Sequence, residues 1–449
     1  MPGHRSRAGK SRLTPWLLLM AAETLYVGFL EVPGARTRLP AYLALHAAAG
    51  ILSILAAAIL SGSRPGFLIL AAAVFRATLL FRSPDLSDDI QRYLWDARVA
   101  SAGFSPWAYA PDDPALADVA PSLRARVAHR DVRSVYPPVA QAAFRVGSFG
   151  GRRPRALKAL FAVCDVAIVW LLARQRSVFA AALYAFHPLP VLEVAGQGHL
   201  DALGVALLLA ALALLGSGRR AAAGVGFALS VLTKYMPLAA LLPMARRGGS
   251  RFVLAGAAVV SALWLASARG GVTPAGGLPD YATRWSFNSA VYPAAVGVMR
   301  ASSVPARAKA LFLDLKRRLG HPAWTESVFP YFYDAFFARA ALGVMLALVL
   351  LAVGLRVAET RAAVFGSLAA VLVFSPTVQP WYLLWTLPFA AERREPAFLY
   401  LSFAVPLSYA LLYPTRGLTP PRVLALEYAP FAALLAVTLF RAGRRARAS

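Results

Sequence analysis

Long apolar runs alternate with short arginine-rich segments along almost the whole chain. Many of the runs come close to the ~20 residues that an α-helix needs to cross the hydrocarbon core of a bilayer. We therefore expect an all-α polytopic membrane protein that forms one domain over residues 1–449, with about 12 transmembrane helices. The predicted spans are 13–32, 39–60, 66–82, 156–175, 177–192, 199–216, 252–268, 331–355, 362–376, 380–391, 397–413 and 422–441.

The basic clusters between the runs predict the orientation, because arginine and lysine concentrate in cytoplasmic loops. The apolar segment 221–243 has arginines at both ends and a break at Lys234–Pro237, so we expect a re-entrant helical pair there. Both termini are then cytoplasmic, and the N-terminal run is an uncleaved first helix. The clusters are Arg5, Arg7, Lys10 and Arg12; Arg64; Arg174 and Arg176; Arg219 and Arg220; Arg246, Arg247 and Arg251; Arg356 and Arg361; Arg393 and Arg394; and Arg441, Arg444, Arg445 and Arg447. The predicted outer segments are 83–155, 193–199, 269–330, 376–380 and 414–421.

Acidic residues are scarce, and they gather in the first polar segment, 83–102. The chain has 21 acidic residues against 47 basic ones, and four of the aspartates fall close together here, at Asp85, Asp88, Asp89 and Asp96. Apolar residues at Ile90, Tyr93, Leu94 and Ala97 recur with helical spacing, while Asp88, Arg92 and Asp96 lie on the other side. We expect a short helix with Ser87 as its N-cap and Gly103 as its stop. Two interpretations remain open: ordinary capping chemistry, or a carboxylate held at the membrane face as a base or metal ligand.

The overall charge points to lipid rather than to nucleic acid. The formal net charge is +26, but the arginines lie between apolar runs in a chain that is 59% hydrophobic. That pattern is typical of orientation signals and lipid-headgroup contacts, so we expect membrane lipids as partners and no nucleic acid. The single cysteine, Cys164, lies in an apolar run, which excludes an intramolecular disulfide and offers no thiolate metal site.

The predicted outer segments suit glycosyl transfer from a lipid-phosphate sugar. An acceptor hydroxyl must lose its proton as it attacks the anomeric carbon, so a positioned carboxylate is needed. The leaving phosphate needs cations or hydrogen-bond donors more than it needs a general acid. The outer segments carry these groups: acids in 83–155, a polar stretch at 193–201, and a basic loop at 269–330.

Five segments resemble the GT-C superfamily of multi-spanning glycosyltransferases, and most closely its bacterial polyprenyl-phosphate-mannose-dependent mannosyltransferases. Together they extend over most of residues 60–390. In chain order they are SDDIQRYLWDARVASAGFSPWAYAPDDPAL, VYPPVAQAAF, HPLPVLEVAGQGHLDAL, LTKYMPLAALLP and FSPTVQPWYLLW. The resemblance implies a large catalytic outer loop at 83–155. It also implies inverting transfer of a hexose, as in mannosyltransferases, from a polyprenyl-phosphate donor to a glycolipid or glycan acceptor outside the cell membrane.

The resemblance places an acidic catalytic residue on Asp88 or Asp89. The sequence does not separate the two, although helical alignment with Arg92 and Asp96 favours Asp88 as the base. The family has a histidine where this chain has Gln379, which can still donate a hydrogen bond. No cofactor is required by the sequence. The two aspartates could help to bind a divalent cation, but adjacent helical residues point about 100° apart and no His/Cys ligand set accompanies them.

The remaining predicted substrate-binding residues each have a structural alternative. His199 and Asp201 could orient donor or acceptor, or could belong to an interfacial helix cap. Lys234 could reach the lipid phosphate, or could snorkel. The others could bind sugar or phosphate, or could serve packing and headgroup anchoring. The full set of predicted substrate-binding residues is Arg92, Tyr136, His199, Asp201, Lys234, Arg284, Gln379 and Trp381.

Two charged residues inside predicted spans need partners in lipid, and we expect Glu23 and Arg76 to pair with each other or with a headgroup.

The alternative function is a multi-spanning secondary transporter or flippase for a lipid-linked or small polar substrate, which also uses broken helices and intramembrane charge. A transporter predicts two related halves and charges near the midplane, and the sequence has no such halves. A structural membrane protein, with an incidental acidic loop, is the third possibility.

Overall fold

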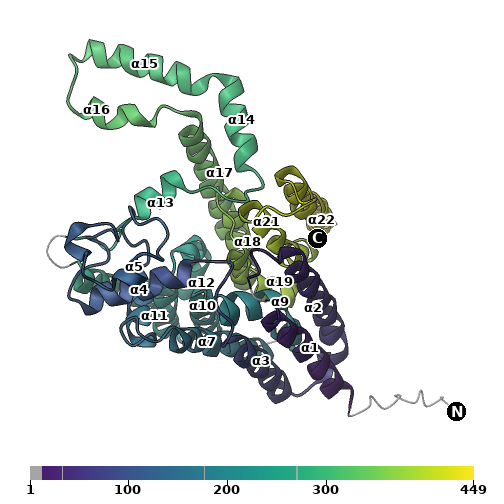
Figure 1. Cartoon of the computed structure of the whole chain (residues 1–449). Coiled ribbons are helices and arrows are strands. Elements are labelled where there is room, and N and C mark those ends of the chain that lie inside the picture. Colours follow the sequence, from purple (N-terminus) through teal and green to yellow (C-terminus); the bar gives the residue numbers. More distant parts are fainter. Residues whose placement is uncertain (1–12, 33, 176, 269–271, 449) are drawn as a thin grey trace.

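The computed structural model describes residues 13–448 except 33, 176 and 269–271. Throughout this part of the chain the regular secondary structure is helical, with only two isolated β-bridges, Phe287–Thr377 and Thr415–Leu418 (Figure 1). The predicted all-α class is therefore confirmed. The predicted N-terminal basic cluster, the position of Arg176 and the first residues of the predicted 269–330 loop lie outside the described residues.

Within the described residues, five helical stretches are long and apolar enough to cross a membrane. A sixth is added if two helices bent by 49° at His187 count as one span. The five stretches are α2 with the 3-10 turn η1 (Leu39–Ile59, Leu60–Gly62), α7 (Pro154–Gln175), η4 with α12 (Met236–Ala240, Leu241–Ser267), α17 (Asp334–Arg356) and α22 (Pro420–Ala448). The bent pair consists of α8 (Val178–Phe186) on one side and α9 (Pro188–Pro190) with the π-helical turn η3 (Val191–Gly196) on the other. This arrangement is consistent with a multi-pass membrane protein.

Shorter apolar helices occupy most of the other predicted spans. They have 10–17 residues, which is below the length of a full crossing. They are α1 (Thr14–Leu30), α3 (Pro65–Leu79), α10 (Asp201–Gly216), α11 (Arg220–Val231), α18 (Thr360–Phe374) and the stretch of α20 (Pro396–Ala404), η8 (Val405–Ser408) and α21 (Tyr409–Leu412). The predicted span 380–391 consists of a 3-10 helix, η7 (Pro380–Trp385), followed by the short α19 (Leu387–Arg393).

The predicted re-entrant segment is broken near the predicted position. Helix α11 ends at Val231 and η4 begins at Met236, so Lys234 lies in the non-helical break. The second half does not end at residue 243 as expected, because α12 continues from η4 to Ser267. A backbone kink at Gly249, with φ 66° and ψ −162°, divides α12 near the basic cluster that was predicted to be a loop.

The remaining helices belong to the predicted outer segments. They are α4 (Asp89–Ser101), η2 (Pro114–Leu116), α5 (Pro121–Arg124), α6 (Pro138–Gly147), α13 (Leu278–Arg284), α14 (Tyr292–Ser302), α15 (Val304–Arg318), α16 (Trp324–Val328) and η6 (Phe329–Tyr331). Helices α14 to α16 form an arm that extends away from the rest of the molecule (Figure 1). Helix α4 instead packs against α6, inside the body.

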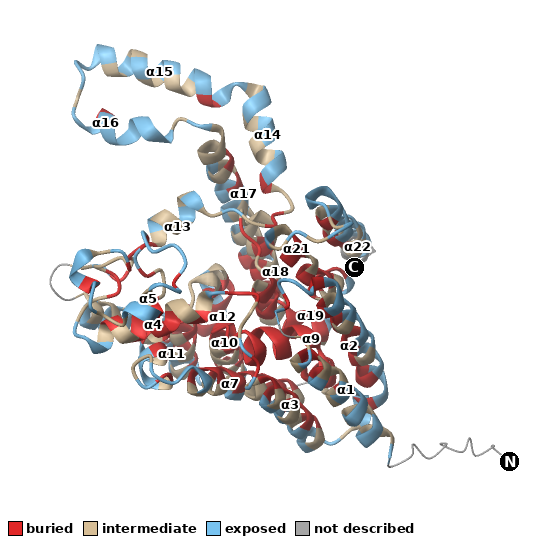
Figure 2. Cartoon of the chain, in the orientation of Figure 1, coloured by how far each residue is buried: buried red, intermediate tan, exposed pale blue. Residues whose placement is uncertain are grey.

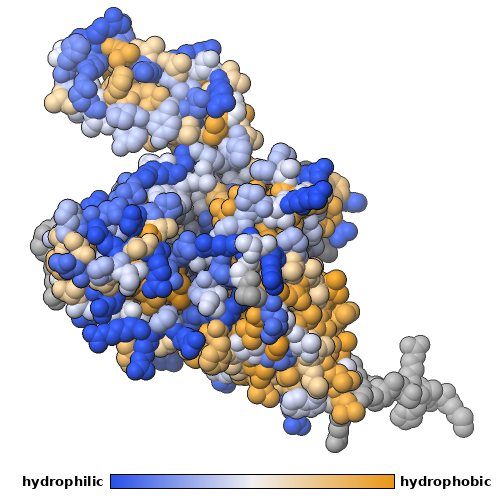
Figure 3. All heavy atoms as spheres, viewed as in Figure 1, coloured by the Kyte–Doolittle hydropathy of each residue, from blue (hydrophilic) through white to orange (hydrophobic). Residues whose placement is uncertain are grey.

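The surface and the interior differ as expected for a protein in lipid. Helices α8 and α10 and the turn η3 are mostly buried, and they form the centre of the core (Figure 2). Helices α1, α12 and α17 carry large exposed apolar side chains, such as Met20, Leu254 and Leu348. Apolar residues gather over α1 to α3 in Figure 3, while polar residues gather around α4, α5 and the arm. Burying such apolar surface in lipid tails avoids the free-energy cost of exposing it to water.

A buried ion pair joins α3, α7 and α8. The Arg76 Nε donates to Asp165 Oδ2 at 2.8 Å, and the two side chains are 1% and 0% exposed. Arg76 Nη1 also donates to the carbonyl of Ala185 at 2.8 Å, and Tyr184 donates to Asp165 Oδ1 at 2.6 Å. The expected pairing of Arg76 with Glu23 is wrong. Glu23 accepts instead from Thr78 on the next turn of α3.

The network predicts a large loss of stability for Arg76→Met. The change leaves the Asp165 carboxylate buried without its cation, and breaking a buried pair in this way costs about 3–5 kcal/mol. We expect a clear fall in the thermal unfolding midpoint in detergent micelles. Replacing both partners, as Arg76→Met with Asp165→Leu, should recover much of that loss.

The exposed Arg64 at the start of α3 provides the matched control. Arg64→Gln should change the free energy of unfolding by less than about 0.5 kcal/mol, since Arg64 is exposed. An Arg76→Met protein as stable as this control would contradict a structural role for the pair.

Candidate active site

Helix α4 carries the acidic cluster to the centre of the predicted outer loop. It begins at Asp89 with Asp88 as the N-cap residue, so the expectation that Ser87 is the N-cap is wrong by one position. The Ser87 hydroxyl still accepts from the backbone N–H of Asp89 at 3.2 Å. The helix ends at Ser101, and Gly103 follows with φ 89°, which fits the predicted stop. The four apolar positions of the predicted pattern are all buried.

The other side of α4 is covered rather than exposed. Asp96 is 1% exposed and accepts from Arg92 Nε at 2.9 Å, from Gln141 Nε2 at 2.8 Å and from the hydroxyl of Ser134. Arg92 also donates through Nη1 to the carbonyl of Val132 at 2.9 Å. Asp96 therefore ties α4 to α6 and to the segment before it, and it holds the Arg92 guanidinium in place. This role was not predicted, because the helical period alone placed Asp96 on a polar surface.

A cavity of about 340 Å³ lies beside the start of α4. Five segments that are far apart in the chain meet around it: the first turn of α4, residues 128–137, the break after α11, residues 278–285, and residues 371–382. Most of the predicted site residues line it. Those that do are Asp88, Asp89, Arg92, Tyr136, Lys234, Gln379 and Trp381.

His199 lies directly behind the cavity, between two carboxylates. Its Nδ1 is 3.6 Å from Asp89 Oδ2 and its Nε2 is 3.4 Å from Glu193 Oε2. The imidazole is fully buried and stacks on Trp381, with ring centroids 3.7 Å apart. Glu193 is also buried and accepts from the Tyr409 hydroxyl at 2.9 and 3.0 Å. A carboxylate, an imidazole and a second carboxylate thus lead from the core to the cavity.

The backbone before His199 explains its position. Glu193 lies on the π-helical turn η3, an irregularity that is frequent at functional sites. Gly198 follows with φ 87°, a conformation that favours glycine. A Cβ at Gly198 would lie 2.7 Å from Ile90 Cδ1, so glycine also allows this turn to pack closely on α4. The close packing brings His199 within reach of Asp89.

The two adjacent aspartates have different environments. Asp89 is about one-third exposed, with a side-chain exposure of 35%, and receives a long contact of 3.4 Å from the Tyr93 hydroxyl. Burial raises the pKa of Asp89. The contact with His199, the charges of His199 and Lys234 and the Tyr93 hydroxyl outweigh burial and lower this pKa below its ordinary value. Asp89 is therefore held as a carboxylate at the edge of the cavity.

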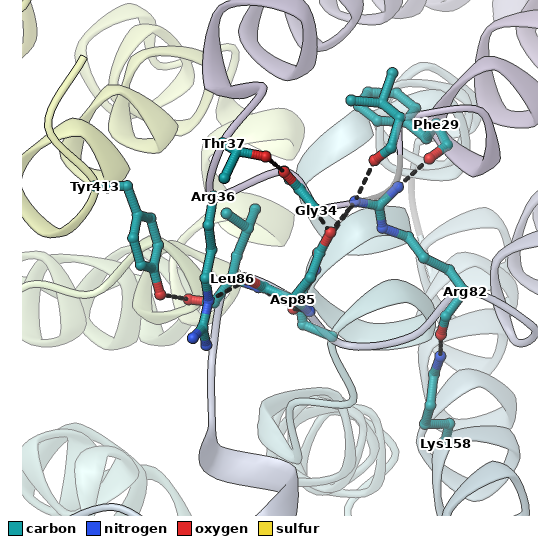
Figure 4. A network of polar contacts seen from close by, with 12 residues as sticks. Phe29, Gly34, Arg36, Thr37, Arg82, Asp85, Leu86, Lys158 and Tyr413 are labelled. Carbon is teal, nitrogen blue, oxygen red and sulfur yellow. Dashed lines mark hydrogen bonds and ion pairs between the residues drawn. The ribbon is translucent and has the colours of Figure 1, made fainter.

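Asp88 instead forms an ion pair. Its Oδ1 is 2.7 Å from Arg36 Nη2, and both side chains are about half exposed. Arg36 also donates through Nε to the carbonyl of Asp85 at 2.6 Å, in a network that includes Tyr413 and Leu86 (Figure 4). The charge of Asp88 is thus paired with a cation, whereas the carboxylate of Asp89 faces the imidazole of His199.

Lys234 provides a cation at the opposite wall. Its Nζ is 2.7 Å from Asp201 Oδ1 and 4.2 Å from the centre of the Tyr382 ring. Asp201 is fully buried and also accepts from Trp385 Nε1 at 2.6 Å. It lies in the first turn of α10 but caps no backbone N–H there. Asp201 therefore positions Lys234, whose ammonium group keeps donors that can face the cavity.

The sequence predictions did not include every residue of the cavity wall. Tyr281, Trp285 and Tyr382 line it as well, although none of them was among the predicted site residues. The Gln379 Oε1 is buried and has no hydrogen-bond partner among the described residues. Arg284, which was predicted to bind substrate, does not line the cavity. Its Nη1 is 2.7 Å from the carboxylate of Asp131 at the surface.

Some of the missed residues had a signal in the sequence. Glu193 stands in the same polar stretch as His199, but no local pattern pairs them. Tyr281 lies in the aromatic stretch of the second predicted outer loop.

Within the described ranges, no group of three or more His, Cys, Asp or Glu side chains is placed to hold a metal ion.

Comparison with known proteins gives one match. The family model described as the MptB C-terminal domain matches residues 333–442, which is less than half of the chain. No curated protein and no solved structure matches the chain. The matched region runs from α17 into α22 and contributes Gln379, Trp381 and Tyr382 to the cavity. It points to a membrane-embedded glycosyltransferase of the mannosyltransferase type.

Proposed function

We propose that this protein transfers mannose from a polyprenyl-phosphate donor to a hydroxyl group of a glycolipid or glycan acceptor. The observation that carries the proposal is the position of Asp89. Its carboxylate faces a cavity of about 340 Å³ whose walls also hold Lys234 and Arg92. A base and two cations in one cavity match what the transfer requires: removal of a proton from the nucleophile and stabilisation of a departing phosphate.

In the proposed reaction, Asp89 accepts the proton of the acceptor hydroxyl as its oxygen attacks the anomeric carbon. The bond from that carbon to the phosphate oxygen breaks, and the electron pair leaves with polyprenyl phosphate. Attack opposite to the leaving group inverts the anomeric configuration. We assign the base to Asp89 rather than to Asp88, which the helical alignment favoured, because Arg36 neutralises Asp88 at 2.7 Å.

His199 supports this base. It lies 3.6 Å from Asp89 and 3.4 Å from Glu193, and such contacts are often long in a site without its substrate. In the proposed mechanism His199 orients the Asp89 carboxylate and stabilises its charge. Glu193 in turn holds the imidazole, and the stack on Trp381 fixes the plane of the ring.

The remaining walls suit the donor. Lys234 and Arg92 can stabilise the phosphate charge, and the orphaned amide of Gln379 can form a hydrogen bond with a sugar hydroxyl. Aromatic residues such as Tyr136, Trp381 and Tyr382 offer flat apolar faces to a sugar ring. Val371 and Leu372 extend the wall onto the apolar helix α18, in the direction that a lipid tail needs. This apolar side supports a lipid-linked donor over a water-soluble one.

The proposed topology is the GT-C arrangement, with about 12 crossings in one domain, a re-entrant pair at the Lys234 break and the active site on the outer face. The helices found in 12 of the predicted apolar stretches support it, although several are short. The convergence of three predicted outer segments, 83–155, 269–330 and 376–380, on one cavity also supports it. No step of the proposed reaction is assigned to a metal ion.

The first prediction separates the two aspartates. Asp89→Asn should lower the transfer rate about 10²- to 10⁴-fold in membranes supplied with polyprenyl-phosphate mannose and a glycolipid acceptor, because the base is lost. Asp88→Asn is the matched control, with the same change one residue away. It should retain most of the activity. Wild-type transfer by Asp89→Asn would refute the assigned base, and uptake of a labelled solute by reconstituted vesicles without transfer would favour a transporter.

The second prediction concerns pH. Transfer needs the ionised form of Asp89, and the lowered pKa of Asp89 places the acid limb of kcat/KM below the ordinary aspartate value of about 3.9. His199→Ala removes a group that lowers this pKa while burial still raises it. The acid limb should therefore move to higher pH. Arg284→Gln, outside the cavity, should leave the limb in place, and a His199→Ala limb that moves to lower pH would contradict the assigned role.

The third prediction tests the outer face. In a Cys164→Ser background, a cysteine at the exposed Ser122 should react with a membrane-impermeant maleimide in intact cells. A cysteine at the exposed Ser217, beyond the far end of α10, should react only after the membrane is opened. The reverse pattern would place the cavity on the cytoplasmic side.

A further inference from the structure

A second cavity lies on the opposite face of α4 from the candidate active site. Its volume is about 590 Å³, and Ile90, Gln91 and Leu94 form the wall that α4 contributes. The other walls are residues 80–84, which follow α3, and residues 153–158 at the start of α7. One helix thus separates two cavities.

The second cavity is lined by cations without a carboxylate. The five basic side chains among its lining residues are Arg82, Arg126, Arg153, Arg155 and Lys158, and none of the residues that line it is Asp or Glu. Three of these, Arg126, Arg153 and Arg155, are exposed and form no ion pair within the described part of the chain. Uncompensated positive charge around a cavity attracts anions.

The other two cations form a fixed inner wall. Lys158 Nζ donates to the carbonyls of Leu79 at 3.2 Å and Leu80 at 3.1 Å. It also donates to the carbonyl of Arg82 at 2.7 Å (Figure 4). Arg82 is held by Asp85 at 2.8 Å, and its buried Nε has no hydrogen-bond partner among the described residues. The carbonyls fix the position of the Lys158 amine, and the Arg82 charge is already paired with Asp85. The inner wall is therefore ordered before any ligand binds, and Arg126, Arg153 and Arg155 carry the unpaired charge of the cavity.

The start of α7 adds to this field. The helix begins at Pro154, so the backbone N–H groups of Arg155 and Ala156 have no intrahelical acceptor. The positive end of the helix dipole points toward the same cavity, and helix N-termini favour phosphate for this reason. The helix N-terminus, the basic side chains and the cavity are three separate features, and each of them favours binding of an anion.

The apolar rim indicates where the anion comes from. Phe81 is 69% exposed, and the Arg155 guanidinium lies 5.5 Å from the centre of its ring. Leu80 lies beside Phe81 in the wall. Helix α7 is long and apolar enough to cross a membrane and begins at this rim, so the proposed topology puts the cavity at the level of the lipid headgroups. A free inorganic anion makes no contact with an apolar rim, whereas a phospholipid can place its acyl chains along it.

We propose that this cavity binds the phosphate group of an anionic phospholipid. Arg126, Arg153 and Arg155 contact the phosphate oxygens, and the acyl chains lie against Phe81 and the outer face of α7. The site does not depend on the proposed transferase function, because no residue of the first cavity takes part in it.

The test is native mass spectrometry of the detergent-solubilised full chain with phosphatidylglycerol, phosphatidylcholine or inorganic phosphate as probes. The wild-type protein should retain phosphatidylglycerol in preference to phosphatidylcholine. The triple change Arg126→Gln, Arg153→Gln and Arg155→Gln should weaken retention about ten-fold or more, since it removes the charge-assisted contacts. The matched control, Arg64→Gln with Arg219→Gln and Arg220→Gln, removes the same charge at exposed sites elsewhere and should retain the lipid.

A second variant guards against a folding defect. Ala156→Glu places a carboxylate in the first turn of α7, which favours the helix but repels a phosphate, so it should lose the lipid without loss of thermal stability. Unchanged retention in the triple variant and in Ala156→Glu would overturn the proposal. A different result would show that the site binds a free anion and not a lipid: millimolar inorganic phosphate displaces the lipid from the wild-type protein, and the same variants no longer bind the phosphate.

Discussion

The need to satisfy backbone polar groups inside a membrane protein governs where this site can lie. Within lipid, a helix can break only where other protein groups or a wet cavity surround the freed N–H and C=O groups. In this chain three breaks fall around one cavity: the π-helical turn before His199, the non-helical residues around Lys234, and the segment between α18 and η7. Each break supplies a polar side chain to a place that regular apolar helices could not reach.

The buried polar contacts of the site are arranged so that few charges stand alone. Asp201 holds Lys234 at 2.7 Å, and Asp96 holds Arg92 at 2.9 Å. In both pairs the acid is buried and the base lies at the cavity wall. A buried carboxylate is costly without a partner, so each acid keeps its cation in position. The wall therefore carries positive charge in a defined geometry, which is what recognition of a phosphate requires.

Helix α4 lies in the predicted outer loop, and its two faces have different chemistry. One face carries the carboxylate of Asp89 toward His199, and the other borders the basic cavity near Lys158. Asp85 lies just before the helix, accepts from Arg82 at 2.8 Å and takes part in the network around Arg36. A ligand in the basic cavity would thus contact the same packed element that positions the proposed base, with Arg82 and Asp85 between them.

Local pattern in the sequence determined the helices and their breaks. The apolar runs correctly predicted an all-helical chain, the amphipathic period predicted α4, and the prolines and polar residues predicted the interruptions near Lys234 and Gln379. These features follow from a few neighbouring residues, so a single sequence is enough to show them. The sequence also predicted in part which segments meet around the cavity. Loops that leave the membrane on the same face can contact one another, so their polar residues were expected to lie together.

The tertiary structure alone decided how individual side chains pair. Asp165 is the partner of Arg76, Asp96 is buried under α6, and Asp89 rather than Asp88 faces His199. Each of these contacts joins segments tens of residues apart in the chain. The helical period shows only which face a residue is on. Which element covers that face, and which charge it brings, depends on the packing of the whole bundle.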